Sequence, residues 1–162
     1  MTDSVDNLVV RLAEQLVANG WKMAAAESCT GGWISKVCTD VPGSSAWFER
    51  AFITYSNEAK NQMLGVDEKL LLEFGAVSRE VAEAMAEGAA ANAPVQVSVA
   101  VTGVAGPDGG SDEKPVGTVW FAWSVDQKIV SECCRFDGDR EAVRRQTVEH
   151  ALERLFSLVK DQ

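Results

Sequence analysis

The sequence predicts an α/β fold in which helices cover both faces of a mixed sheet, giving three layers (α/β/α). In the first part of the chain, short apolar segments suited to strands alternate with segments whose apolar residues recur at helical spacing. Residues 95–102 alternate valine with polar or small residues, which is typical of a central strand. Residues 117–125 and 128–136 are rich in Val, Trp, Phe and Ile, and predict an antiparallel hairpin beside the parallel strands.

The N-terminal elements follow from apolar spacing and from glycines. Residues 5–18 predict a first helix that ends at Asn19-Gly20, a usual C-terminal signal. Its apolar residues at helical spacing are Leu8, Val9, Leu12, Leu16 and Val17. The apolar run 23–26 predicts a short buried strand. Thr30-Gly31-Gly32 then leads into residues 33–37, which predict a second helix.

The middle of the chain predicts one strand and three helices. Residues 51–55 have the composition of a strand, and residues 57–64 that of a helix. A short helix is expected over residues 67–74. Ser78 is a good N-cap for an alanine-rich helix that runs to about Ala91.

The C-terminal part begins at the central strand and ends in a long helix. The central strand runs into the glycine-rich loop 103–110. The two strands of the hairpin are joined around Asp126-Gln127, a connection short enough for a tight turn. Asp139 is the expected cap of the final helix, whose apolar positions include Val143, Leu152, Leu155, Phe156 and Val159.

Length and composition fit one cytoplasmic domain over residues 1–162. A chain of this length with 46% apolar residues can bury a core without disulfides or metals. We expect no membrane span, because no window reaches roughly 18 uninterrupted apolar residues. The N-terminus lacks the basic start and apolar core of a signal peptide. The net charge of −9 argues against a nucleic-acid partner, which needs clustered Lys and Arg.

The cysteines favour neither disulfides nor a metal site. Cys29, Cys38 and the adjacent pair Cys133-Cys134 show no CxxC spacing, and adjacent residues of a strand point to opposite faces. His150 is the only histidine, and it falls on the predicted final helix. We therefore interpret the cysteines as small buried apolar side chains and expect no metal.

Two glycine-containing loops are candidates for ligand binding. Residues 26–32 join a strand to a helix, where free N–H groups bind anions and Ser28 or Thr30 can add a hydroxyl donor. A plain helix cap is the alternative. Residues 102–110 follow the central strand, and ligand sites of open α/β sheets lie at that end of strands. This loop has neither a P-loop nor a dinucleotide-binding pattern, and a surface loop without a function is the alternative. Lys114, just after it, can add positive charge.

Ser45 and Lys60 flank the predicted strand 51–55, and Tyr55 is its last residue; the three are candidates for histidine-free activation of a serine. Lysine can act as the base if burial or a neighbouring cation lowers its pKa toward neutrality. The alternative gives each residue a structural place: Ser45 as a helix cap, Tyr55 in sheet packing and Lys60 solvated on a helix.

Basic residues of the final helix are a weaker indication of anion binding. Arg140 and Arg144 are four residues apart and share one face of the helix. They can reach a phosphate, or pair with Glu141 and similar neighbours, which is more common.

Several motifs follow one another in a single order over most of the chain. They are Ala26-Glu27-Ser28-Cys29-Thr30-Gly31-Gly32, Pro42-Gly43-Ser44-Ser45, Thr54-Tyr55-Ser56-Asn57-Glu58-Ala59-Lys60, Gly75-Ala76-Val77-Ser78, residues 102–110 and Lys114-Pro115-Val116-Gly117-Thr118-Val119. Together they resemble the CinA C-terminal domain family, the nicotinamide-nucleotide amidases. Longer members carry a separate N-terminal domain, so the resemblance is to the stand-alone form.

The resemblance implies hydrolysis of the carboxamide of nicotinamide mononucleotide to nicotinate mononucleotide and ammonia, without a metal or cofactor. It implies Ser45 as nucleophile, Lys60 as base and Tyr55 assisting, with Ser28 as the rival nucleophile. The residues expected to hold the nucleotide are Ser28, Thr30, Gly31, Gly32, Thr102, Gly103, Ala105, Gly106, Lys114, Arg140 and Arg144. The alternative is a non-catalytic nucleotide-binding or regulatory module. A homo-oligomer is compatible with the sequence.

Overall fold

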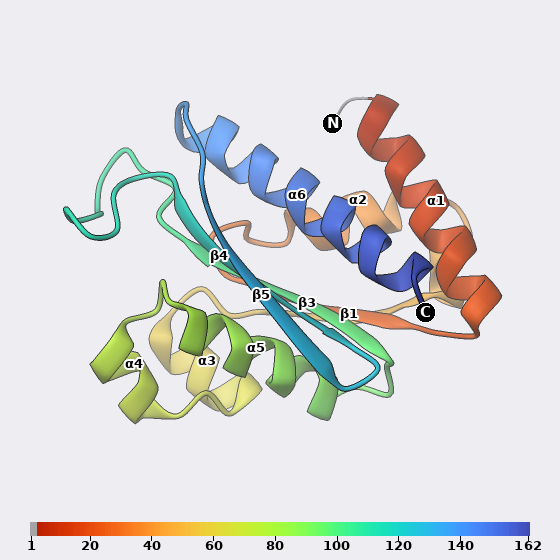
Figure 1. The fold of residues 1–162 in the computed structure, drawn as a ribbon, viewed down its shortest axis with the longest axis horizontal. Helices are drawn as coiled ribbons and strands as arrows, with labels where there is room; N and C mark the ends of the chain where they lie inside the picture. The colour runs from red at the N-terminus through yellow and green to blue at the C-terminus, as the bar shows by residue number, and fades with distance from the viewer. Residues whose placement is uncertain (1–2) are drawn as a thin grey trace.

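The computed structural model describes residues 3–162 and contains a five-stranded mixed sheet between two layers of helices (Figure 1). The strand order is β2-β1-β3-β4-β5. The first three strands are parallel, and β4 and β5 continue the sheet antiparallel. Their bounds are β1 Met23–Glu27, β2 Phe48–Ile53, β3 Val97–Gly103, β4 Thr118–Val125 and β5 Lys128–Arg135. The predicted α/β fold with a C-terminal hairpin is thus confirmed.

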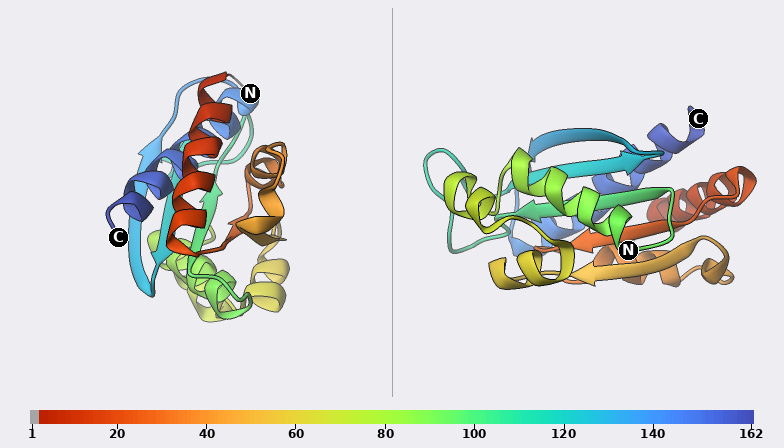
Figure 2. Two further views of the ribbon diagram at one scale, coloured as in Figure 1. Left: turned by 90° about the vertical axis from the view of Figure 1, so that its right-hand side faces the viewer. Right: turned by 90° about the horizontal axis from the view of Figure 1, so that it is seen from below.

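Three helices cover each face of the sheet, and Figure 2 shows both layers from two further sides. One face carries α1 (Asp3–Asn19), α2 (Trp33–Thr39) and α6 (Arg140–Lys160). The other carries α3 (Asn57–Leu64), α4 (Glu68–Phe74) and α5 (Arg79–Ala91). A short 3-10 helix, η1 (Ser44–Ala46), precedes β2.

Local signals explain where several elements begin and turn. The side chains of Ser56, Ser78 and Asp139 each accept a hydrogen bond from a backbone N–H in the first turn of α3, α5 and α6. Asp126 and Gln127 both have positive φ, as a type I′ turn between two strands requires. The predicted caps at Ser78 and Asp139 and the predicted hairpin are therefore confirmed.

The core divides into two clusters, one on each face of the sheet. The valines of β3 at positions 97, 99 and 101 pack toward the α1–α2–α6 layer. The opposite cluster contains Ala26, Ala100 and Ala122, which are partners in register across the three middle strands. These small side chains let the alanine-rich helix α5 pack closely on this face.

Strand β2 differs from the prediction. It runs from Phe48 to Ile53, whereas residues 51–55 were expected. The first half of β2 contains the charged residues Glu49 and Arg50, so a search for apolar runs does not identify it as a strand. β2 lies at the edge of the sheet, where charged side chains reach solvent and protect the edge from pairing with another chain. The strand ends before Thr54, so Tyr55 lies in the loop that leads to α3.

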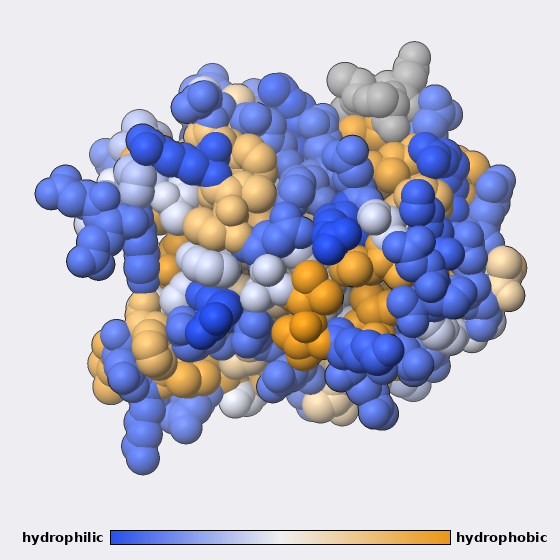
Figure 3. Space-filling model, in the orientation of Figure 1, coloured by the Kyte–Doolittle hydropathy of each residue, from blue (hydrophilic) through white to orange (hydrophobic). Residues whose placement is uncertain are grey.

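The surface is largely hydrophilic on the face shown in Figure 3, with smaller hydrophobic areas between. Within residues 3–162, every helix is too short or too polar to cross a membrane.

Candidate active site

The candidate site lies where the three parallel strands end. In register, Glu27 at the end of β1 is the partner of Ile53 in β2 and of Val101 in β3, so the loops after these strands meet at one edge of the sheet. A cavity of about 230 Å³ opens between these loops. It is lined by Ser28, Cys29, Tyr55, Lys60, Ala76, Val77, Thr102, Gly103, Ala105 and Arg140.

The central contact joins Lys60 to Ser28. Ser56 caps α3, and this start of the helix directs Lys60 inward, where its side chain is only 1% exposed. The Nζ atom donates to the Oγ atom of Ser28 at 2.9 Å. It also donates to the backbone oxygens of Thr54 at 2.8 Å and Tyr55 at 3.1 Å. The interpretation of Lys60 as a solvated helix residue is therefore wrong.

Burial lowers the pKa of Lys60 to about 8. All three acceptors of the ammonium group are uncharged oxygens, which offset only part of the loss of hydration. At pH 7 roughly a tenth of the molecules then carry a neutral amine at this position. A neutral amine next to a serine hydroxyl can accept its proton.

Glu27 fixes the loop that presents Ser28. Its carboxylate is fully buried and accepts four hydrogen bonds. The donors are the hydroxyl of Thr30, the backbone N–H groups of Ile34 and Ser35, and the hydroxyl of Ser35. These two N–H groups lie in the first turn of α2. The sequence suggested that an external anion binds there, but the carboxylate of Glu27 occupies the position instead. The hydroxyl of Thr30 is likewise bound to Glu27 and not directed to a ligand.

Arg144 holds the same loop from α6. Its guanidinium donates to the backbone oxygen of Cys29 at 3.0 Å and to that of Thr30 at 3.1 Å. It also lies over the ring of Trp33, with 5.4 Å between the guanidinium carbon and the ring centroid. With Gly31 and Gly32 in the turn below it, Arg144 acts here as a support of the loop.

The loop after β3 forms the opposite wall. Thr102, Gly103 and Ala105 line the cavity as expected, although the Thr102 hydroxyl donates to the backbone oxygen of Ala76. A Cβ atom at Gly103 would lie 2.7 Å from a methyl carbon of Val119, so only glycine fits this end of the strand. The backbone oxygen of Gly106 accepts a hydrogen bond of 2.8 Å from Arg140.

Arg140 and Tyr55 lie at the mouth of the cavity. One terminal nitrogen of Arg140 is bound to Gly106, and the other lies 3.4 Å from the Tyr55 hydroxyl. Tyr55 is 64% exposed, so its ring is not part of the sheet packing considered for it. Lys114 is elsewhere: its Nζ atom donates to the backbone oxygen of Phe74, and it lines a neighbouring cavity of about 460 Å³.

Ser45 does not join this site. It lies exposed in η1, before β2 begins, whereas Tyr55 and Lys60 follow the end of β2. A strand of six residues spans roughly 20 Å, which separates the two ends. The convergence of Ser45 with Lys60 that the sequence suggested is therefore not found, and Ser28 occupies the place beside Lys60.

Three residues that line the cavity were not predicted as site residues: Cys29, Ala76 and Val77. Glu27, which holds the Ser28 loop from outside the cavity lining, was not predicted either. A signal for Glu27 existed, since a lone carboxylate ends an apolar strand immediately before a glycine turn. Cys29 has a thiol whose pKa burial raises to about 11, so it is neutral near pH 7 and no rival to Ser28 as nucleophile.

Comparison with known proteins gives a family for this geometry. The model of the CinA C-terminal domain matches residues 5–159. The chain belongs to this family. It is 55% identical over 156 residues to the nicotinamide-nucleotide amidohydrolase PncC of Pseudomonas putida, covering 96% of this chain and 98% of the relative. It is 54% identical over 159 residues to PncC of Escherichia coli (strain K12), covering 96% of each.

Solved structures agree in fold. The crystal structure of the competence/damage inducible protein CihA from Agrobacterium tumefaciens superimposes with a TM-score of 0.95 at 42% sequence identity. The match covers 98% of this chain and 97% of that protein. The family member described here thus shares its whole α/β arrangement with a crystal structure.

Proposed function

We propose that this protein is a nicotinamide-nucleotide amidohydrolase that converts nicotinamide mononucleotide to nicotinate mononucleotide and ammonia. The observation that carries the proposal is the 2.9 Å hydrogen bond between Lys60 Nζ and Ser28 Oγ inside the cavity at the strand ends. Two relatives that are more than half identical to this chain are named nicotinamide-nucleotide amidohydrolases. The alignments cover almost the full length of both relatives.

The first half of the proposed reaction forms an ester on Ser28. Neutral Lys60 takes the proton of the Ser28 hydroxyl as Oγ attacks the carboxamide carbon. The carbonyl oxygen becomes an oxyanion, and we assign its stabilisation to the backbone N–H of Cys29, the residue that directly follows the nucleophile. Lys60, now an ammonium, returns its proton to the amide nitrogen, the C–N bond breaks and ammonia leaves.

The second half releases the product. Water attacks the ester carbon while Lys60 again accepts a proton, and the carbon–Oγ bond breaks to give nicotinate mononucleotide. Ser28 recovers its proton from Lys60. Every proton transfer uses the same pair of side chains, and their contact places them within the distance such transfer needs.

The mouth of the cavity suits the phosphate end of the substrate. Arg140 lines the cavity and holds its guanidinium near the Tyr55 hydroxyl. Guanidinium groups bind phosphate through paired N–H donors. Arg144 is already bound to two carbonyl oxygens of the Ser28 loop, so we assign it to holding that loop and not to the nucleotide.

The deciding experiment is ammonia release from nicotinamide mononucleotide by the purified protein and two serine variants. Ser28→Ala should lower turnover by at least ~10³-fold, because the attacking oxygen is lost. Ser45→Ala is the matched control and should keep normal turnover, since Ser45 is exposed at the other end of β2. Equal losses in both, or full turnover in Ser28→Ala, would refute the assignment.

The same assay separates the enzyme from the alternative, a nucleotide-binding or regulatory module. Such a module would bind nicotinamide mononucleotide in a calorimetric titration and release no ammonia. If the protein hydrolyses other amides but not nicotinamide mononucleotide, the proposed Ser28–Lys60 mechanism stands and the proposed substrate is wrong.

A further inference from the structure

Three side chains with metal-binding atoms meet between β5 and α6, and none of them lines the Ser28 cavity. Glu132 and Cys134 come from β5, and His150 comes from α6. A carboxylate oxygen, the thiol sulfur and an imidazole nitrogen all lie within 4.8 Å of one another. The proposed amidase chemistry uses none of them, so their meeting needs its own explanation.

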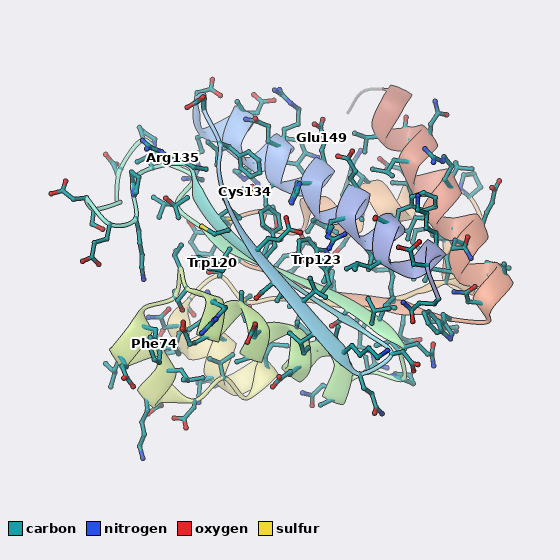
Figure 4. All side chains as sticks on the ribbon, in the orientation of Figure 1. Phe74, Trp120, Trp123, Cys134, Arg135 and Glu149 are labelled. Carbon is teal, nitrogen blue, oxygen red and sulfur yellow. The ribbon has the colours of Figure 1, made fainter. Side chains whose placement is uncertain are left out.

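Strand alternation brings the two β5 residues to the same face. Glu132 and Cys134 are two residues apart, and Val130, Cys134 and Phe136 pack against the core cluster that includes α6. Figure 4 labels Cys134 on β5, beside α6. Ser131, on the opposite face, bonds to Glu83 of α5. Cys133 therefore points away from the trio, although it is adjacent in sequence.

The ligand atoms are already near the spacing that zinc requires. Two ligands about 2.0–2.1 Å from a tetrahedral zinc ion lie about 3.3 Å apart. The distance from His150 Nε2 to Glu132 Oε1 is 3.2 Å. The sulfur of Cys134 lies at most 4.8 Å from the other two ligand atoms. It must move about 1 Å closer to them to bind the same ion, and rotation about one side-chain torsion provides such a shift.

Neighbouring residues hold the ligands in orientation. Arg154 donates to Glu132 Oε2 at 2.9 Å, which leaves Oε1 facing His150. The imidazole lies edge-on against the ring of Phe121, with 4.8 Å between the ring centroids. Such supporting contacts set the orientation of metal ligands in known sites. The side chains of His150 and Glu132 are partly exposed, so an ion has access from solvent.

We propose that Glu132, Cys134 and His150 form a binding site for a zinc-class divalent cation, with a fourth position left to water. A thiolate, an imidazole and a carboxylate match the ligand preference of zinc and cobalt and not that of magnesium or calcium. The bound ion would clamp the edge strand β5 to α6, the helix that carries Arg140 and Arg144.

Charge sets the conditions under which the site fills. A carboxylate and a thiolate neutralise the two charges of the ion, and Arg154 adds one positive charge beside them. Cysteine binds zinc as a thiolate, so the ion displaces the thiol proton of Cys134 and its affinity should rise with pH.

The test is a titration of the reduced, metal-free protein with Co²⁺, followed by absorbance. We expect one equivalent to bind with a thiolate-to-cobalt charge-transfer band and the visible bands of a tetrahedral ion, both removed by Zn²⁺. Cys134→Ser should abolish the charge-transfer band, whereas the matched variant Cys133→Ser should retain it. His150→Gln and Glu132→Gln should each weaken Co²⁺ binding by at least ~100-fold, more than the loss of a supporting contact causes.

Two outcomes would overturn the proposal. One is the absence of a thiolate band in the unmodified protein, which would leave Glu132, His150 and Arg154 as a simple ion-pair network. The other is an equal band in Cys134→Ser. Circular dichroism of each variant shows whether it is folded, and His150→Gln tests the site without altering either cysteine. No part of the test uses amidase turnover, so it stands apart from the proposed function.

Discussion

Two buried charges flank Ser28, and their surroundings differ. Glu27 precedes it in the chain, and its carboxylate accepts bonds from the start of α2 and from two hydroxyls. Lys60 reaches it through space, and its ammonium donates only to uncharged oxygens. A helix start stabilises negative charge, whereas carbonyl and hydroxyl oxygens only partly replace the water that an ammonium loses.

The difference assigns a role to each charge. Glu27 ties strand β1, the loop after it and helix α2 into one unit, so its work is structural. Lys60 has a pKa lowered to about 8 by burial, and one of its acceptors is the hydroxyl it would deprotonate. Equal burial therefore yields a fixed anchor on one side of Ser28 and a proton acceptor on the other.

The largest effect should come from removing the amine. Lys60→Met keeps the length of the side chain and should lower ammonia release by about 10³-fold, since no base remains for Ser28. Lys69→Met is the control, because Lys69 is exposed on α4. Turnover within tenfold of the unmodified protein in Lys60→Met would exclude Lys60 as the base.

The next effect should come from the anchor, and it should appear in stability. Glu27→Ala leaves two backbone N–H groups and two hydroxyls without an acceptor and should lower the free energy of unfolding by about 3 kcal/mol. Glu27→Gln keeps one acceptor oxygen and should lose less. Urea unfolding measures both, with the exposed Asp40→Ala, partner of Lys36, as a control expected within about 0.5 kcal/mol. If Glu27→Ala lowers the free energy of unfolding as little as Asp40→Ala does, Glu27 does not anchor the loop.

The pH dependence of stability tests the state of Lys60. Its pKa is about 8 in the folded protein and near 10.5 in the unfolded chain. Between these values the unfolded chain binds more protons, so the free energy of unfolding should rise with pH. Between pH 7 and pH 10 the unmodified protein should gain about 2 kcal/mol relative to Lys60→Met. Parallel curves for the two proteins would show that burial does not lower this pKa.

The pKa of Lys60 should also appear in catalysis. Turnover on nicotinamide mononucleotide at low concentration should increase about tenfold per pH unit below pH 8 and level off above it, because only the neutral amine accepts the proton. A profile that is flat from pH 6 to pH 9 would contradict a lysine base.

The smallest effect is expected at Tyr55. Its hydroxyl is exposed and lies 3.4 Å from Arg140, while the contact to Lys60 uses the Tyr55 backbone oxygen. Tyr55→Phe keeps that oxygen and should change turnover by less than about threefold. A loss of about 10² or more would restore the assisting role that the family resemblance implies for its hydroxyl.

Local chemistry determined much of this protein from the sequence by itself. The caps at Ser78 and Asp139 and the turn at Asp126-Gln127 depend on residues within a few positions, so their patterns predict the elements correctly. The alternating valines of β3 likewise mark a strand buried on both faces. The prediction was weaker at β2, because an edge strand tolerates the charges of Glu49 and Arg50.

Only the tertiary structure decided which residues meet. Proximity in sequence favoured Ser45 beside Lys60, but an extended strand carries the two to opposite ends, while the parallel register aligns the ends of β1 and β2. Ser28 and Lys60 are 32 positions apart and come into contact for that reason. His150 approaches Cys134 in the same way, through the packing of α6 on β5. Such contacts depend on strand order and register, which no local pattern encodes.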